Sequence, residues 1–196
     1  MPERTFGDPA IRSALRSFVL TKRAYKVDTI LIEELGICRG RVRVDLAVVD
    51  DLLHGFEIKS DRDSLRRLAR QVTYYSRVLD KATIVVGKSH LDEALKVVPI
   101  WWGVLLYQPS PKGLNFKMRR RGRKNPQRDP RSLVELLWLD EAIALLEARD
   151  VARGVRGKPR RFVWDRVCEY IELDELADTV RAILKGRSMQ QAPALP

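Results

Sequence analysis

The sequence predicts an α/β protein, with a mixed β-sheet flanked by helices and a C-terminal helical module. Three observations support this prediction. Patterns typical of a helix, two strands, a helix, a strand, a helix and a strand follow one another within residues 1–118. A basic stretch broken by glycine and proline comes next, and helical periodicity then returns. Hydrophobic residues make up 45% and charged residues 32% of the 196 residues, which favours a packed core beneath a charged surface.

The first predicted elements are a helix and a β-hairpin. The stretch "DPAIRSALRSFVLTKR" has a cap residue at Asp8, a proline at the first helical position and apolar residues at helical spacing. The next stretch, "TILIEELGI", fits either the end of a helix or an extended segment. Residues 41–49 and 53–60 read as strands, and the short turn between them is typical of an antiparallel hairpin.

Helices and strands alternate through the rest of the predicted core. The stretch "SLRRLARQVTYYSRVLD" places its apolar residues on one stripe and its arginines mostly elsewhere, as in an amphipathic helix. The stretches "KATIVVG" and "WWGVLLYQ" read as strands, with a short helix, "HLDEALKVVP", between them. Because adjacent strand residues face opposite sides of a sheet, we expect one of Trp101 and Trp102 in the core and the other at the surface.

The chain divides into four predicted segments. Residues 1–118 form the core, 119–131 a basic linker or flap, 132–188 a helical module and 189–196 a disordered tail. The run "KMRRRGRKNPQRDPR" holds eight Lys or Arg residues against one Asp. A homodimer is one candidate assembly, and the candidate surface for it comprises Leu136, Leu137 and Trp138.

Charge and cysteine content narrow the expected partners and setting. The formal net charge is +11, so nucleic acid is the expected partner, ahead of an acidic membrane. Cys38 and Cys168 lie far apart, which gives no indication of a disulfide framework or a metal cluster and fits a reducing cytoplasm. The first residues lack the apolar segment of a signal peptide, and no apolar run is long enough to span a membrane.

One charged face of the predicted hairpin gathers groups typical of a metal site. Glu57 and Lys59 share a strand face, while Phe56 and Ile58 point the other way. Asp45 can lie across the hairpin from that pair. Two neighbouring carboxylates repel each other unless a cation lies between them, and Mg²⁺ prefers oxygen ligands. A lysine beside such an ion could orient or deprotonate a bound water, or stabilise charge on a phosphate oxygen.

These residues resemble the signature of the PD-(D/E)XK nuclease superfamily, in which an acidic residue ends one strand and Glu-x-Lys lies in the next. Here the signature reads Asp45 and Glu57-Ile58-Lys59, with Val44 where the motif name has proline. The resemblance implies a restriction-endonuclease-like fold. It also implies Mg²⁺ or Mn²⁺ held by Asp45, Glu57 and the Ile58 carbonyl, with Lys59 next to the attacking water. The products would be a 5′-phosphate and a 3′-hydroxyl.

Further residues extend the resemblance. Gln71 and Tyr75 have the Q-x-x-x-Y spacing of RecB-type members, although a surface glutamine and a core tyrosine would give the same pattern. Members often carry an upstream acid, and we choose Glu34 over Glu33 with little to separate them. The run from residue 33 to residue 87 is similar to a family of small stand-alone bacterial and phage proteins, mostly without an assigned role.

Basic residues on several segments are candidates for phosphate contacts. Eight positive groups between residues 117 and 131 could neutralise several phosphates and make binding strongly salt-dependent. The stretch "ALLEARDVARGVRGKPRRFVWDRV" resembles a SAP-type helix–turn–helix DNA-binding element. The candidate nucleic-acid-binding residues are Arg43, Arg62, Arg66, Arg70, Arg119, Arg120, Arg121, Arg123, Lys124, Arg156, Lys158, Arg160 and Arg161.

The residues and the resemblance together predict a Mg²⁺-dependent nuclease in the cytoplasm of a bacterial or phage-infected cell. DNA is favoured over RNA as the substrate, and the sequence leaves open whether the enzyme is an exonuclease or an endonuclease. The candidate catalytic residues are Asp45, Glu57, Lys59, Glu34, Gln71 and Tyr75. The alternatives are a structure-specific endonuclease, similar to a Holliday-junction resolvase, and a non-catalytic DNA-binding subunit. The complete set of two acids and a lysine argues against the non-catalytic alternative.

Overall fold

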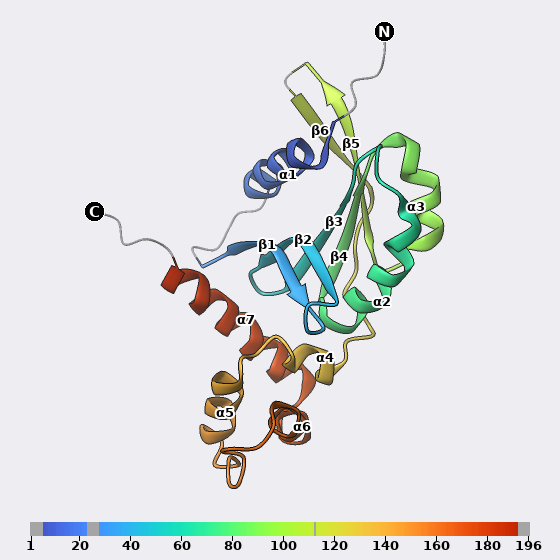
Figure 1. Ribbon diagram of the computed structural model, residues 1–196. Helices are drawn as coiled ribbons and strands as arrows, with labels where there is room; N and C mark the ends of the chain where they lie inside the picture. Colours follow the sequence, from blue (N-terminus) through green and yellow to red (C-terminus); the bar gives the residue numbers. More distant parts are fainter. Residues whose placement is uncertain (1–5, 23–27, 112, 192–196) are drawn as a thin grey trace, which may run out of the picture.

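The computed structural model describes residues 6–22, 28–111 and 113–191. Its centre is a mixed six-stranded sheet with the strands in sequence order (Figure 1). Neighbouring strands are antiparallel except for the pairs β3–β4 and β4–β5, which are parallel. The strands are β1 (Ile30–Ile37), β2 (Val42–Val49), β3 (Leu53–Lys59), β4 (Lys81–Val86), β5 (Gly103–Ser110) and β6 (Gly113–Arg120). The sheet and its flanking helices confirm the predicted α/β class.

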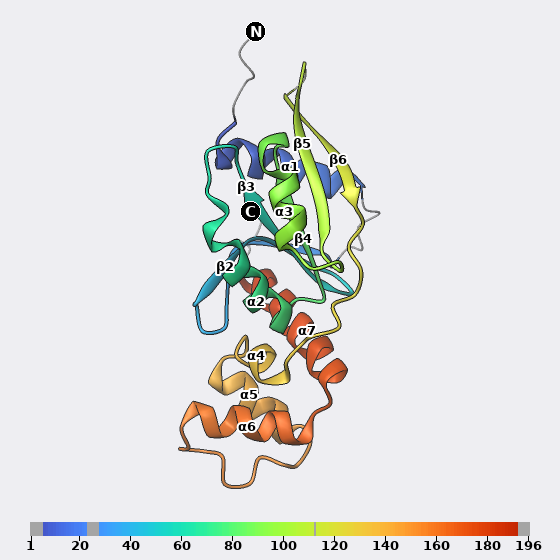
Figure 2. The same ribbon diagram turned by 90° about the vertical axis from the view of Figure 1, so that its right-hand side faces the viewer.

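Helices cover both faces of this sheet. α1 (Asp8–Lys22) lies on one face, and α2 (Leu68–Val78) and α3 (Leu91–Val97) lie on the other (Figure 1). The short 3₁₀ helices η1 (Leu65–Arg67) and η2 (Lys88–His90) precede α2 and α3. The remaining helices gather at one end of the molecule (Figure 2): α4 (Pro130–Val134), α5 (Leu139–Glu147), α6 (Arg160–Tyr170) and α7 (Leu173–Gln191). Within the described ranges, no helix is both long and apolar enough to cross a membrane.

Two amphipathic helices position the site. On α1, Ile11, Leu15 and Val19 recur at intervals of four and are buried in a cluster with side chains of the sheet. Segment 65–79 carries the predicted apolar stripe, which packs against the opposite face of the sheet. Each helix therefore turns its polar side toward the rim of the sheet, where α1 and α2 contribute residues to one cavity.

One buried cluster joins the sheet to the C-terminal helices. It includes Val44 of β2 and Leu133, Leu146 and Val180 from α4, α5 and α7. Leu136 and Leu137, which the sequence suggested for a dimer surface, belong to this cluster and are buried, so that suggestion is wrong for these two residues. Trp138 is exposed, and the Arg187 guanidinium lies 4.0 Å from the centre of its ring.

A buried ion cluster also connects the two parts. The carboxylate of Asp80, 2% exposed, accepts from Arg128 and Arg181 at 2.7 Å each and from the backbone N–H of Leu53 at 2.7 Å. Asp80 follows α2, Arg128 lies before α4, and Arg181 lies on α7. A carboxylate buried this deeply needs such partners, because leaving its charge unpaired costs several kcal/mol, about 3–5 in comparable cases.

The strand β6 is a correction to the sequence-based prediction, which read part of it as basic linker. It runs to Arg120, and Phe116 is its buried side chain. β6 is an edge strand paired with β5 alone, so most of its side chains are exposed and several are basic. The apolar alternation that marks an internal strand is therefore missing from its sequence.

The segment after β6 is held to the core, so it is not a free flap. Its backbone N–H groups donate to core carbonyls: Arg123 to Trp101 at 2.8 Å, and Asn125 to Asp80 at 2.9 Å. The buried Asn125 side chain donates to the carbonyls of Ser76 and Leu79, at 2.7 Å each, and so satisfies the end of α2. An asparagine within a basic run gave no sequence signal of this role.

Three smaller expectations are settled as well. The undecided stretch "TILIEELGI" contains strand β1. Trp101 and Trp102 are both buried, at 5% and 0% exposure, because they lie in the turn before β5, where strand alternation does not apply. Helix α7 continues to Gln191, so the predicted tail begins too early, and residues 192–196 lie outside the described residues.

Candidate active site

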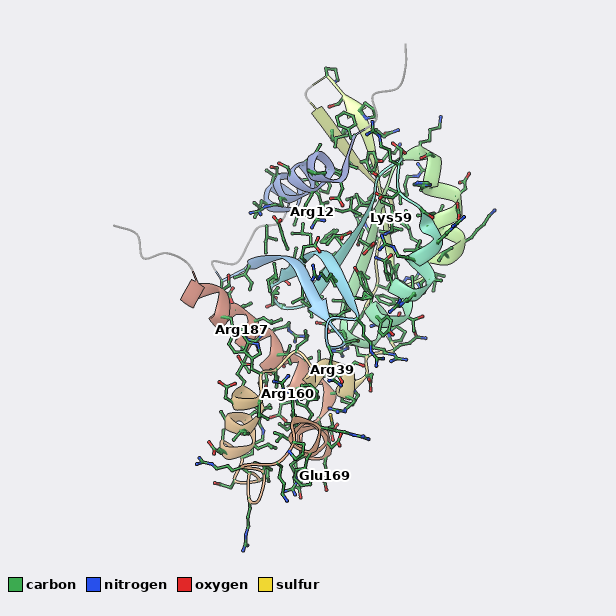
Figure 3. The ribbon with its side chains drawn as sticks, viewed as in Figure 1. Arg12, Arg39, Lys59, Arg160, Glu169 and Arg187 are labelled. Carbon is green, nitrogen blue, oxygen red and sulfur yellow. The ribbon has the colours of Figure 1, made fainter. Side chains whose placement is uncertain are left out.

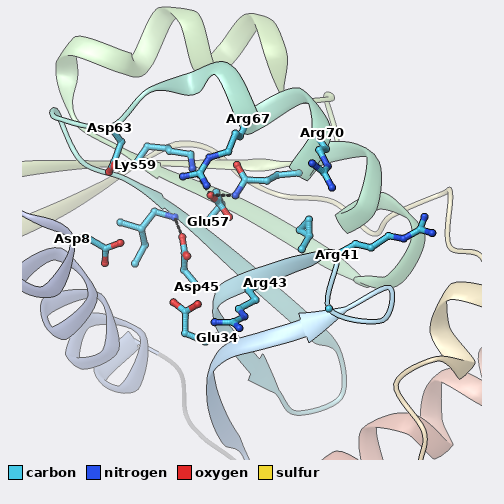
Figure 4. Close-up of a pocket in the computed structure, with 14 residues that line it drawn as sticks. Asp8, Glu34, Arg41, Arg43, Asp45, Glu57, Lys59, Asp63, Arg67 and Arg70 are labelled. Carbon is cyan, nitrogen blue, oxygen red and sulfur yellow. Dashed lines mark hydrogen bonds and ion pairs between the residues drawn. The ribbon is translucent and has the colours of Figure 1, made fainter.

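The candidate site forms where the pairing between strands β2 and β3 ends. The two strands pair from Val49–Leu53 to Leu46–Phe56. Asp45 and Glu57 are the next residues along each strand. There the backbone N–H of Ile58 donates to the Asp45 carboxylate at 2.6 Å. A cavity of about 400 Å³ opens in the gap, and Asp45, Glu57, Ile58 and Lys59 all line it (Figure 4).

Glu34 lies on the other side of Asp45. β1 pairs with β2 through Glu33–Leu46 and Leu35–Val44, a register that places Glu34 opposite Asp45. Glu34 has a φ of 52°, which is rare for a residue with a side chain and marks a local break in the strand. The neighbouring strand shows the same break, because Val44 and Leu46 pack into different buried clusters although they lie two residues apart. Three carboxylates therefore follow one another across β1, β2 and β3.

Three donors hold the carboxylate of Glu57, which is 1% exposed. Lys59 Nζ lies 2.6 Å from its Oε1, and the Gln71 side-chain amide donates to the same oxygen. The Tyr75 hydroxyl donates to Oε2. Gln71 and Tyr75 are four residues apart on α2, so both point to one place. The geometry thus brings the Q-x-x-x-Y pair to the acid of the Glu-x-Lys motif.

Burial fixes Tyr75 as a hydrogen-bond donor to Glu57. Its side chain is 0% exposed, and its ring stacks on Trp102 with centroids 5.5 Å apart. Burial, followed by the charge of Glu57, raises the pKa of Tyr75 far above its ordinary value. The hydroxyl therefore keeps its proton and acts as a donor to the carboxylate. It also lies 2.9 Å from the backbone carbonyl of Arg43, which ties α2 to β2.

The charge of the Asp45 carboxyl group is only partly compensated by its surroundings. Burial, and next the charge of Glu57, raise the pKa of Asp45 to about 7. The hydrogen bond from Ile58 and the charges of Arg12 and Lys59 act in the opposite direction without cancelling these effects. A proton or a cation between Asp45 and Glu57 would relieve the repulsion.

The donor atoms at this point suit a hard divalent cation. Asp45 and Glu57 supply carboxylate oxygens, and Ile58, whose carbonyl the motif implies as a ligand, lines the same cavity. In the described parts of the chain, no group of three His, Cys, Asp or Glu side chains could hold an ion by itself. Side chains and backbone oxygens together would therefore have to provide the ligands, as the sequence motif implies.

Arg12 of α1 is a site residue that the sequence reasoning missed. Its Nη1 donates to the Asp45 backbone carbonyl at 2.6 Å and lies 2.8 Å from Glu34 Oε1. Its Nη2 lies 3.6 Å from Asp45 Oδ1, and Asp8 pairs with its Nε at 3.2 Å. Burial lowers the pKa of Arg12, but the acidic partners outweigh this and raise it overall. Only the Asp8 spacing, four residues earlier on the helix, was visible in the sequence.

Further cations surround the cavity. Arg43 and Arg70, both predicted to bind nucleic acid, line it, together with Arg41 and Arg67, which the prediction omitted. Arg62 and Arg66 are exposed on the segment before α2 but are not part of the lining. The described cavity lining therefore has five positively charged side chains: Arg41, Arg43, Lys59, Arg67 and Arg70.

The other predicted basic residues lie away from the cavity. Arg119, Arg121, Arg123 and Lys124 are exposed. Arg120 differs, because its guanidinium donates to the carbonyls of Trp102 and Pro99 at 2.8 and 2.9 Å, which is a structural role.

The loop between α5 and α6 and the first turn of α6 carry a separate basic cluster. Its predicted members, Arg156, Lys158, Arg160 and Arg161, are all exposed. Lys158 and Arg160 lie over the rings of Phe162 and Trp164, 5.9 and 5.5 Å from their centres. Arg160 lies in the helical end of the molecule, whereas Arg12 and Lys59 lie near the sheet (Figure 3). The structure therefore separates two of the predicted basic regions.

Comparison with known proteins places the chain in a phage family. Protein cII of Enterobacteria phage P4 is 35% identical over 104 residues, which cover 53% of this chain and 39% of that protein. The match thus spans about two fifths of that relative. A solved structure of a protein of unknown function from Silicibacter pomeroyi aligns with a TM-score of 0.44 and 16% identity, over 81% of this chain and 98% of that chain. The family model of bacteriophage P4 protein cII matches residues 1–195, and the chain therefore belongs to the bacteriophage P4 protein cII family.

Proposed function

We propose that the protein is a metal-dependent nuclease of the PD-(D/E)XK type that hydrolyses phosphodiester bonds in DNA. One observation carries this proposal: the cavity holds Asp45, Glu57 and Lys59 together, with Glu57 fixed by donors from α2. A buried carboxylate with a purely structural role would need only the hydrogen-bond donors around it. Here a second carboxyl group, that of Asp45, lines the same cavity and its charge is only partly compensated, which supports binding of a cation.

Asp45, Glu57 and the Ile58 carbonyl would hold Mg²⁺ or Mn²⁺. When bound, the ion would polarise a phosphate oxygen and lower the pKa of a bound water. Gln71 and Tyr75 keep Glu57 oriented. Lys59 contributes a positive charge beside the reacting phosphate and orients the attacking water.

The hydrolysis adds one water across the phosphodiester. The water oxygen bonds to phosphorus as the bond from phosphorus to the 3′ oxygen breaks. The 3′ oxygen takes a proton, which leaves a 3′-hydroxyl and a 5′-phosphate. The side-chain oxygen of Gln71 is buried beside Glu57 and has no hydrogen-bond partner within the described ranges.

Charge supports nucleic acid as the substrate. The four arginines of the cavity could pair with phosphates on either side of the reacting bond. The net charge of +11 favours approach of a polyanion to the whole molecule. Membership of a phage P4 protein family supports action inside an infected bacterial cell. DNA is the substrate we propose, with RNA as the comparison in the assay.

The proposal predicts nicks that DNA ligase can reseal. Purified protein should nick supercoiled plasmid with Mg²⁺ or Mn²⁺, and EDTA should stop the reaction. Because the predicted ends are a 5′-phosphate and a 3′-hydroxyl, ligase should restore closed circles without prior treatment of the ends. Ends that ligase cannot join would contradict the proposed chemistry, and loss of linear DNA alone would indicate an exonuclease. Binding without cleavage under every condition would favour the non-catalytic DNA-binding subunit.

We further propose that the basic cluster of the α5–α6 loop and the first turn of α6 contacts DNA phosphates. Replacing Lys158 and Arg161 together by Gln should weaken DNA binding and reduce the slope of log K against log salt by about 2, since each phosphate contact contributes about 0.9. The matched control replaces Lys88 and Lys96, exposed lysines of η2 and α3, by Gln. Fluorescence anisotropy over a salt series measures the DNA affinity and the salt slope of each double variant. Equal slopes for the two double variants would show that this basic cluster does not contact DNA phosphates.

A further inference from the structure

Arg12 occupies the position between two of the three carboxylates. β2 lies between β1 and β3, so Asp45 has Glu34 on one side and Glu57 on the other. Arg12 reaches Glu34 Oε1 at 2.8 Å and stands 3.6 Å from Asp45 Oδ1. Its side chain is 16% exposed, whereas that of Glu34 is 47% exposed. The Glu34 side of Asp45 thus already has a fixed positive charge.

We propose that Arg12 takes the place of a second divalent cation, so that the cavity binds a single metal ion on the Glu57 side of Asp45. This inference rests on the proposed nuclease function. It assigns Glu34 to the positioning of Arg12 and not to the binding of an ion. Glu34 was a candidate catalytic residue in the sequence, and here its nearest cation is supplied by the chain itself.

The position of Arg12 is fixed from two sides. Asp8, one helical turn earlier, pairs with its Nε at 3.2 Å, and the Asp45 carbonyl accepts from its Nη1 at 2.6 Å. Ile11 and Leu15, both fully buried, anchor the same part of α1 to the sheet. Guanidinium stays charged at any pH at which the protein is folded. A second ion would have to move Arg12 and overcome its positive charge.

Counting bound Mn²⁺ tests this inference without reference to activity. Electron paramagnetic resonance reports free Mn²⁺ in a titration, so the number of ions bound per chain follows by difference. Wild-type protein should bind one ion. Arg12→Gln should bind a second ion, because removal of the guanidinium frees the Asp45 backbone carbonyl next to the carboxylates of Asp8, Glu34 and Asp45. The matched control is Arg16→Gln: Arg16 lies one turn further on α1, pairs with Glu33, and should leave the count at one.

Glu34→Gln provides a second test that does not depend on losing Arg12. Because Glu34 pairs with Arg12 and not with the ion, the variant should still bind one Mn²⁺ with affinity within about threefold of wild type. Two ions in wild type, one ion in a folded Arg12→Gln protein, or loss of the ion in Glu34→Gln would each overturn the inference and leave the proposed function standing. No Mn²⁺ bound by wild type or by any variant would overturn both.

Discussion

Asp45→Asn is expected to abolish cleavage without destabilising the metal-free protein. The substitution removes a negative charge from a place where another carboxylate lies close by, and its side-chain oxygen can still accept the Ile58 N–H. Cleavage should fall at least about 100-fold, since a neutral amide is a poor ligand for a hard cation and the proposed chemistry depends on that ion. The midpoint of thermal unfolding in EDTA should stay the same or rise.

The stability effect of Asp45→Asn should depend on pH. The native carboxyl group holds its proton up to about pH 7, whereas the unfolded group releases it near 3.8. The free energy of unfolding of wild type therefore falls as the pH rises between these values, because the unfolded carboxyl group ionises while the native one keeps its proton. The advantage of the variant in unfolding free energy should grow over this window and then level off. Asp92→Asn, at an exposed position of α3, should change neither activity nor stability. If Asp45→Asn were less stable than wild type at high pH, the account would be contradicted.

Asp80→Ala is expected to lower the free energy of unfolding by about 3–5 kcal/mol, because it leaves Arg128 and Arg181 buried without their shared carboxylate. The sheet and α7 both depend on this contact, so the loss should appear as one cooperative transition in urea. Asp178→Ala is the matched control, since Asp178 pairs with the same Arg181 but its side chain is 76% exposed. Its loss should cost about 1 kcal/mol or less. Equal effects of the two variants would contradict a structural role for the Asp80 cluster.

The core of the fold and the central acids follow from local sequence patterns. Helical spacing gave α1 and α2, and the strand alternation of the hairpin placed Asp45, Glu57 and Lys59 at one site. The spacing of Gln71 and Tyr75 then sufficed to bring both to Glu57. These features could be predicted because each depends on periodicity within one element or on a single tight turn.

The missed features depend on contacts between distant segments. Arg12 reaches the site only because α1 crosses the sheet at Asp45, and helical periodicity by itself makes it an ordinary polar residue. β6 lacks apolar alternation because one edge and much of its surface face solvent. Asn125 fastens the basic segment through carbonyls of Ser76 and Leu79, nearly fifty residues earlier in the sequence. Local propensity contains no information about such partners.

The central claim is that this cavity cleaves DNA with the help of a divalent ion. The most direct test compares the nicking of supercoiled plasmid by wild type and Asp45→Asn, purified side by side and assayed with Mg²⁺ and with EDTA. The account predicts nicking by wild type with Mg²⁺ alone, and none by the variant although it is folded and binds DNA. Equal nicking by both proteins, or none by wild type with either Mg²⁺ or Mn²⁺, would contradict it.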